Sequence, residues 1–147
     1  MALFKSDRGP CYEYRFIATF EETNVVGNIY FANYALWQGK CREMFLYEYC
    51  RDILRDINNG LALITTDLSL QFISQLFAFD QVVVRMTLGA HSQSRLMMEF
   101  EYFREVDGQL TLVCRGHQAT VAMRKVDDKL VAESFPEALL DILEAYS

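Results

Sequence analysis

Three polar residues near one predicted helix have side chains that could stabilise negative charge on a substrate: Asn24, Tyr34 and Arg42. The Asn24 amide can donate and accept hydrogen bonds, so it could orient a water molecule or bind a developing oxyanion. The Arg42 guanidinium is a permanent cation, and loss of one such donor typically costs about 3 kcal/mol of barrier. The Tyr34 hydroxyl could lie beside a substrate carbonyl. This set indicates chemistry in which charge develops on a carbonyl oxygen.

Each of these residues also has a plainer interpretation. Asn24 could hold a turn or cap a helix, and Arg42 could form a structural ion pair with a carboxylate of the sheet or of a second subunit. Tyr34 could be a buried core residue with a satisfied hydroxyl. Thr65, in the segment ALITTDL, could bring a hydroxyl to the helix of a partner subunit, or it could be an ordinary strand threonine.

The remaining titratable residues give weaker signals. Glu48 falls on the apolar stripe of the helix and is a rival general base, although an arginine could also be its partner, whereas Glu43 points away. His91 and His117 stand in no motif with a carboxylate or cysteine, so we expect a loop and a strand histidine. The cysteines form no C-x-x-C pair, which predicts buried free thiols, no metal site and no disulfides. No cofactor is expected, because phosphate-binding glycine loops are also absent.

One long helix must position these residues. From about Phe31 to Asp56 the chain has no proline, and its apolar residues recur at helical spacing. At about 100° per residue, one stripe contains Tyr34, Trp37, Cys41, Phe45 and Tyr49. Asn58-Asn59-Gly60 supplies the stop, since these residues tolerate a left-handed conformation.

Strands account for most of the rest of the chain. A first strand is predicted at Cys11 to Phe20, and strands follow one another from Gly60 to Pro136, with a hairpin turn at Asp107-Gly108. Pro136 begins a short amphipathic helix. A doubly wound fold would need more helices. We therefore expect one α+β domain over residues 1–147, in which a curved antiparallel sheet of about five strands wraps a long central helix.

Composition restricts the partners. Lys and Arg number 14 against 20 Asp and Glu, and this acidic balance argues against nucleic acid. No segment is apolar enough for a signal peptide or a membrane span, so a cytoplasmic protein is expected. The high apolar fraction, 52%, suggests an oligomer and a lipophilic pocket. The basic residues that could dock an acidic carrier, or could simply be scattered charge, are Arg85, Arg95, Arg104, Arg124, Lys125 and Lys129.

The loop and helix carry a family resemblance. The segment EETNVVGNIYFANY contains the pattern N-x-x-G-x-x-Y-x-x-N-Y-x-x-W, which resembles hotdog-fold thioesterases of the 4-hydroxybenzoyl-CoA thioesterase type. The run YFANYALWQGKCREMFL, residues 30–46, is similar to the enediyne-biosynthesis thioesterases, with their W-Q-G-x-C-R-E block.

The resemblance implies a thioester hydrolase. The implied reaction is hydrolytic release of a linear polyene chain, held as a β-ketoacyl thioester on the acyl carrier domain of an iterative polyketide synthase. It also implies a homodimer or homotetramer with the active site between subunits. The alternatives are a general acyl-CoA thioesterase and a non-catalytic acyl-binding protein.

The resemblance assigns roles to particular residues. The Phe31 backbone amide would polarise the thioester carbonyl, and Asn24, Tyr34 and Arg42 would complete the catalytic set. Substrate contacts are assigned to Gly27, Tyr30, Trp37 and Thr65. Asn24 stands where the hydroxybenzoyl-type enzymes have an aspartate, and an amide can neither attack a thioester usefully nor take up a proton at neutral pH. The implied mechanism is direct attack by water without a catalytic carboxylate there.

Overall fold

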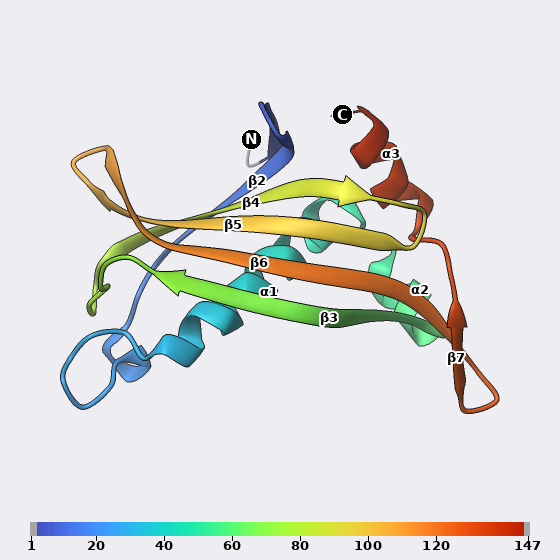
Figure 1. The fold of residues 1–147 in the computed structure, drawn as a ribbon, viewed down its shortest axis with the longest axis horizontal. Helices are drawn as coiled ribbons and strands as arrows, with labels where there is room; N and C mark the ends of the chain where they lie inside the picture. The colour runs from blue at the N-terminus through green and yellow to red at the C-terminus, as the bar shows by residue number, and fades with distance from the viewer. Residues whose placement is uncertain (1–2, 146–147) are drawn as a thin grey trace.

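The computed structural model describes residues 3–145, which form one curved antiparallel sheet with a central helix against its concave face (Figure 1). The strands are β1 (Leu3–Ser6), β2 (Gly9–Ile17), β3 (Leu61–Phe72), β4 (Gln81–His91), β5 (Arg95–Val106), β6 (Gln109–Val126) and β7 (Lys129–Ala132). The helical segments are η1 (Phe20–Glu22), α1 (Phe31–Tyr49), α2 (Ile53–Asn58) and α3 (Glu137–Ala145). The predicted α+β architecture is confirmed.

The sheet order is β1-β2-β4-β5-β6-β3, and β7 pairs with the end of β6. All of these pairings are antiparallel. The sheet therefore contains seven strands, the expected long ones together with the short β1 and β7. Strand β3 lies at one edge of the sheet, since among the described residues it pairs only with β6.

Helix α1 buries the predicted stripe against the sheet. Tyr34, Trp37, Cys41 and Phe45 are each at most 3% exposed, and they contact the β2, β4 and β5 side chains of one apolar core. Tyr49 is half-buried and packs on Phe45 and Tyr12. Gln38 is also completely buried, which is unusual for an amide and requires internal hydrogen bonds.

The helix is shorter than predicted. It ends at Tyr49, the chain turns through residues 50–52, and α2 follows until Asn58, so the single helix to Asp56 is wrong. The turn allows both Cys50 and Ile53 to be buried, and it contains neither glycine nor proline, which is why the sequence pattern does not reveal it. The predicted stop at Gly60 is confirmed by its φ of +107°.

The predicted first strand corresponds to β2, and its bounds differ from those predicted. It begins at Gly9 and ends at Ile17; of the residues expected at its end, Ala18 and Thr19 lie outside any strand and Phe20 begins η1. The Asp107-Gly108 hairpin is confirmed, with positive φ at both residues. A second such turn, at Asp127-Asp128, separates β6 from β7.

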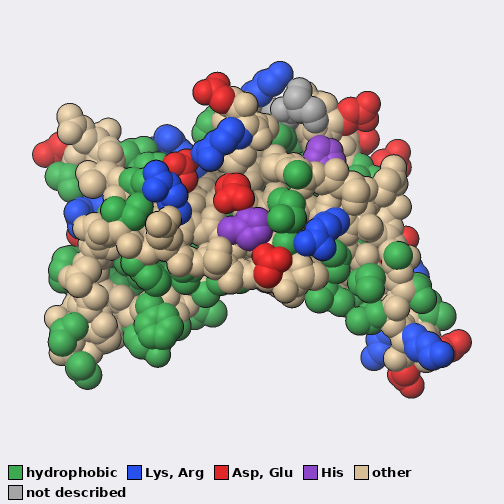
Figure 2. Space-filling view, viewed as in Figure 1, with side chains coloured by type: hydrophobic (Ala, Val, Ile, Leu, Met, Phe, Trp, Pro, Cys, Tyr) green, Lys and Arg blue, Asp and Glu red, His purple; other side chains and the backbone are tan. Residues whose placement is uncertain are grey.

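The outer face of the sheet is polar. Figure 2 shows this face, with acidic side chains beside a histidine near its middle. On β6, His117 has its Nε2 3.2 Å from Asp67 of β3 and its Nδ1 2.8 Å from Glu99 of β5. His117 is thus a strand histidine as predicted, but it has two carboxylate neighbours that the sequence pattern does not indicate. None of the described helices is long and apolar enough to cross a membrane.

Candidate active site

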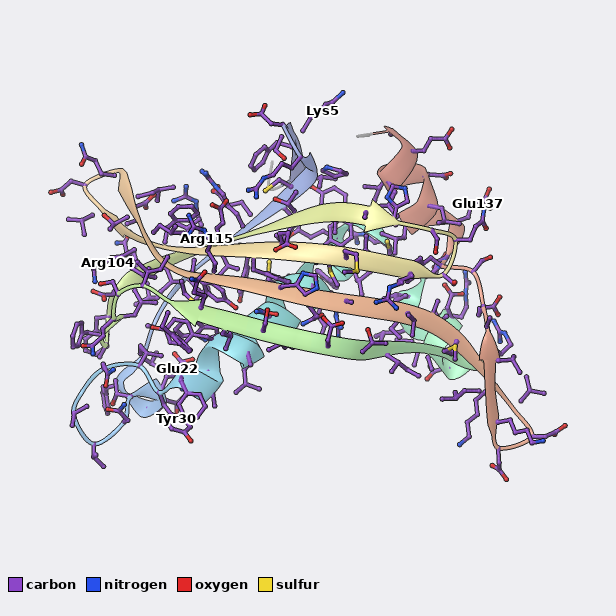
Figure 3. The ribbon with its side chains drawn as sticks, viewed as in Figure 1. Lys5, Glu22, Tyr30, Arg104, Arg115 and Glu137 are labelled. Carbon is purple, nitrogen blue, oxygen red and sulfur yellow. The ribbon has the colours of Figure 1, made fainter. Side chains whose placement is uncertain are left out.

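The loop of residues 23–30 is fixed to α1 by Glu22. The Glu22 backbone oxygen accepts hydrogen bonds from the Tyr30 amide and from Asn33 Nδ2, at 2.9 and 2.7 Å. One of its carboxylate oxygens accepts from Thr19, and the other accepts from Trp37 Nε1 at 2.8 Å. Both oxygens of the carboxylate two residues before Asn24 are therefore engaged, so Glu22 holds the loop rather than serving as a free base. Figure 3 labels Glu22 and Tyr30 at this end of the molecule.

A cavity lies where the loop meets the start of α1. Its lining includes Asn24, Phe31 and Tyr34, so the structure brings together three of the four predicted catalytic residues. The other lining residues are Asn28, Ile29, Phe72, Ser74 and Gln75. This set contains amide, hydroxyl and aromatic groups and no carboxylate.

Asn24 has one polar group engaged and one available. Its Oδ1 accepts a hydrogen bond from the Val26 amide at 3.0 Å, which is the turn-holding role considered from the sequence. Gly27 follows with a φ of +94°, which a residue with a side chain rarely adopts. Because Oδ1 is occupied in the turn, the Nδ2 group is the part of Asn24 that can serve a substrate, and it can only donate.

The first turn of α1 supplies a second donor. Tyr30 is the N-cap and makes no side-chain capping hydrogen bond. The Phe31 backbone N–H therefore has no acceptor within the helix, and it lies at the positive end of the helix dipole. Tyr34, 3% exposed, has its ring in the core beside Trp37 and Phe72. Burial, opposed by a hydrogen bond with the Leu76 backbone, raises the pKa of Tyr34 to about 12, so its hydroxyl stays protonated at neutral pH.

Arg42 lies farther along α1, against the β3–β6 pair. Its Nη1 donates to Gln118 Oε1 at 2.9 Å, Thr65 Oγ1 at 3.1 Å and Thr120 Oγ1 at 3.4 Å. Thr65 and Thr120 are opposite each other in the strand register, and Gln118 lies two residues before Thr120, on the same face of β6. The register shifts between Thr65 and Asp67, next to this site.

All the partners of Arg42 are neutral. Within residues 3–145 no carboxylate lies within ion-pair distance of its guanidinium, and its Nε is buried without a hydrogen-bond partner. Burial lowers the pKa of Arg42, and the Glu43 carboxylate acts in the opposite direction. An arginine starts from so high a pKa that it remains charged. An intrasubunit ion pair therefore does not explain this residue.

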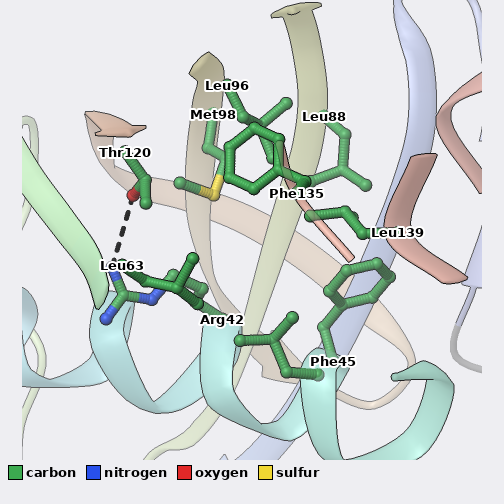
Figure 4. A pocket seen from close by; sticks show the side chains of 10 residues that line it. Arg42, Phe45, Leu63, Leu88, Leu96, Met98, Thr120, Phe135 and Leu139 are labelled. Atoms are coloured by element: carbon green, nitrogen blue, oxygen red, sulfur yellow. Dashed lines mark hydrogen bonds between the residues drawn. The ribbon is translucent and has the colours of Figure 1, made fainter. Parts of the chain in front are cut away.

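A narrow apolar cavity extends from Arg42 toward α3 (Figure 4). Apart from Arg42 and Thr120, every lining residue is apolar: Phe45, Leu46, Leu63, Leu88, Leu96, Met98, Phe135 and Leu139. The cavity is small, about 20 Å³, whereas a typical ligand pocket has roughly 300 Å³ or more, so this apolar space does not by itself accommodate an acyl chain. The cation stands beside this cavity and is the only charged group in its lining.

One subunit does not bring all the predicted site residues into one pocket. Asn24, Phe31 and Tyr34 line the loop cavity, whereas Arg42 and Thr65 meet near the other one. Eleven helical residues from Phe31 to Arg42 correspond to about 16 Å along the axis.

The residues assigned to substrate contacts are equally dispersed. Tyr30 is 45% exposed, and Trp37 is 2% exposed and packs in the core. Gly27 lies in the exposed loop, and Thr65 lies on β3.

The rival titratable residues take structural roles. Glu48 accepts a hydrogen bond from the Tyr12 hydroxyl at 2.7 Å, so the arginine partner considered for it is replaced by a tyrosine. The four cysteines are buried free thiols as predicted, and burial raises the pKa of each. Among the described side chains, no group of three His, Cys, Asp or Glu is placed to hold a metal.

The basic residues considered for carrier docking are distributed over several strands. Arg85 pairs with Glu13, Arg104 lies 3.9 Å from Asp80, and Arg124 pairs with Glu133. These intramolecular partners favour scattered structural charge at these three positions.

Sequence reasoning missed Gln118 and Thr120 as neighbours of Arg42. Both lie on β6, far from Arg42 in the chain, and only the strand register brings them to the helix. The period-2 spacing in QAT, residues 118–120, could have placed them on one face, but it does not identify what they contact.

Comparisons with known proteins identify the family of the chain. The thioesterase-like superfamily matches residues 18–143. The chain is similar to a dynemicin thioesterase whose crystal structures concern polyene binding, with 40% identity, a TM-score of 0.87 and coverage of 92% of this chain and 96% of that one. No match is found among curated proteins.

More distant structures share the fold. A 1,4-dihydroxy-2-naphthoyl-CoA thioesterase from Synechocystis is 17% identical, with a TM-score of 0.77 and coverage of 90% and 95%. A 4-hydroxybenzoyl-CoA thioesterase from Pseudomonas sp. strain CBS-3 is 13% identical, with a TM-score of 0.74 and coverage of 90% and 98%.

Proposed function

The chain belongs to the thioesterase-like superfamily and hydrolyses thioesters, and we propose that its substrate is a β-ketoacyl polyene carried by the acyl carrier domain of an iterative enediyne polyketide synthase. The 40% identity to a dynemicin thioesterase supports a polyene as the acyl group. This similarity is the single observation that carries the proposal, because it covers 92% of this chain and 96% of the dynemicin enzyme. A cytoplasmic location, with the synthase, is part of the same proposal.

The site supports direct attack by water. Asn24 Nδ2 and the Phe31 amide of one subunit, with an Arg42 guanidinium brought to them across a subunit interface, would bind negative charge on the substrate oxygens. The water oxygen bonds to the thioester carbon, the tetrahedral intermediate collapses, and the carbon–sulfur bond breaks. One water proton passes to solvent as the oxygen attacks, the other remains on the acid or is then released to solvent, and the leaving thiolate takes up a proton from solvent. No side chain is acylated in this sequence.

A homodimer would complete the site. The β3 edge is unpaired on one side among the described strands, and joining it to a second sheet would cover it. Large apolar side chains are also exposed around the loop: Phe20, Val25, Val26, Tyr30, Phe31, Phe72, Ile73, Phe77 and Phe79. An apolar surface of this kind is typical of an interface. A second pairing would give a tetramer, and sedimentation that showed a stable monomer would contradict the assembly.

An aspartate at position 24 is expected not to accelerate the enzyme. The Asn24→Asp variant replaces the donating Nδ2 with a carboxylate oxygen, which would repel an anionic substrate oxygen. We expect kcat to fall by about 100-fold or more, as for loss of an oxyanion donor. Single-turnover rates of the variant and the wild-type enzyme would measure this. A faster Asn24→Asp enzyme would indicate that a carboxylate base can operate in this loop.

A substrate comparison tests the function itself. Purified protein would be incubated with a panel of acyl-CoAs and with polyene-loaded carrier domain, and free acid would be quantified. The proposal expects faster release from the loaded carrier. Equal turnover of simple acyl-CoAs would support a general acyl-CoA thioesterase, and binding without turnover would support an acyl-binding protein.

A further inference from the structure

The guanidinium of Arg42 is held from one side only. All three of its hydrogen bonds leave from Nη1, while Nε is buried and unpartnered. An arginine side chain has many rotamers, and no carboxylate among the described residues fixes this one. Its position must therefore depend on the neutral acceptors at Nη1.

Gln118 provides the shortest of these contacts, 2.9 Å, and is 2% exposed. Its orientation is determined by a second buried amide. Gln118 Nε2 donates to Gln38 Oε1 at 3.3 Å, and Gln38 Nε2 donates to the Ser69 backbone oxygen at 3.2 Å. Because arginine only donates and a backbone carbonyl only accepts, the two amides are consistent with one orientation, in which Gln118 Oε1 faces Arg42.

Gly116 makes room for this amide pair. A Cβ at Gly116 would lie 2.2 Å from Gln38 Nε2 and 3.3 Å from the Ser69 oxygen. Gln38 and Arg42 are one helical turn apart on α1, and Gly116, Gln118 and Thr120 alternate along β6. The Gln38 of the W-Q-G block thus belongs to the same arrangement as the arginine four residues later.

We propose that Gln118, oriented by Gln38, is a positioning residue for Arg42. By accepting from Nη1 it holds the guanidinium beside the apolar cavity and leaves Nη2, which makes no hydrogen bond to the described residues and is not buried, to bind negative charge on the substrate. Both amides are neutral, so the arginine is fixed without an anion that would compete with the substrate. This inference rests on the proposed role of Arg42 in thioester hydrolysis.

A double-mutant cycle tests the proposal. Gln118→Met is expected to lower kcat by about 10- to 100-fold, as for loss of a hydrogen bond to a charged group, with a smaller change in KM. In an Arg42→Met background, the same Gln118→Met change is expected to alter kcat by less than about twofold, because the residue it positions is gone. Gln38→Leu, expected to act more weakly, should show the same dependence on Arg42.

The control is Thr87→Val, which changes a buried polar residue of β4 that makes no contact with Arg42. It should leave kcat nearly unchanged in both backgrounds. Thermal unfolding would accompany every variant, and Gln38→Leu replaces Gln118→Met in the cycle if the latter does not fold. Full activity of Gln118→Met, or an equal loss with and without Arg42, would overturn the proposal.

The cycle can use whichever thioester the wild-type enzyme hydrolyses fastest. Failure of the polyene assignment would appear as slow turnover of the loaded carrier by the wild-type enzyme. Failure of the positioning proposal would appear as additive effects within the cycle, so the two outcomes are distinct.

Discussion

Replacing Arg42 with methionine is expected to lower kcat/KM by about 100- to 1,000-fold, the usual loss when one donor to a developing oxyanion is removed. Methionine keeps a similar apolar stem at the cavity, so the variant removes the cation and little of the volume. Steady-state kinetics on a carrier-bound thioester would measure the loss.

The melting temperature of the Arg42→Met variant distinguishes a catalytic role of Arg42 from a structural one. Arg42 is half-buried, with its Nε fully buried, and has no carboxylate partner within the described chain, so its charge costs desolvation energy that no ion pair returns. Arg42→Met should therefore retain or raise the melting temperature while it loses activity. A matched loss of activity and stability would instead indicate a structural arginine.

Two carboxylate variants are the controls. Glu48→Gln removes the charge of a residue that accepts from Tyr12, and Glu43→Gln removes an exposed charge on the same helix. Both should stay within about twofold of wild-type activity, since surface changes away from a site have small effects. If Glu48→Gln abolishes activity and Arg42→Met retains it, the base is on the helix.

The local features of the fold follow from sequence patterns because their causes are local. The buried stripe through Trp37, Cys41 and Phe45 follows from the helical spacing of apolar residues. The turn at Asp107-Gly108 forms because both residues tolerate positive φ. The break after Tyr49 has a tertiary cause, the burial of Cys50 and Ile53 after the turn. No residue in the turn carries a helix-ending signal, so the pattern predicts one longer helix.

The site is only partly predictable for a related reason. Asn24, Phe31 and Tyr34 are neighbours in sequence, and they line one loop cavity. The environment of Arg42 instead depends on the register of β3 and β6, since a one-residue slip would turn Gln118 away from the helix. The same register sets His117 between Asp67 and Glu99 on the outer face.

Trp37→Ala is expected to lower the free energy of unfolding by about 3–5 kcal/mol, the range for a large aromatic deleted from a core. For a chain of this size the melting temperature should fall by roughly 10 °C. The Trp37 ring is 2% exposed and packs on Phe16 and Tyr34, with centroids at 4.8 and 5.2 Å. Circular dichroism is the suitable measurement, because Trp37 is the single tryptophan and its fluorescence disappears in the variant.

The smaller change Trp37→Phe distinguishes anchoring of the loop from contact with the substrate. It keeps most of the ring and removes the Nε1 hydrogen bond to Glu22, the residue that ties the loop of Asn24 to α1. If Trp37 acts through that anchor, Trp37→Phe should lose about 1–3 kcal/mol of stability, as for a buried acceptor left unpaired, and kcat should fall with it. A rise in KM at unchanged stability would instead show that the indole contacts the acyl chain. The first result would mean that Glu22 couples the buried stripe of α1 to the loop of residues 23–30, which contains Asn24. Glu22 is structural in this interpretation, because its backbone oxygen and both carboxylate oxygens accept hydrogen bonds.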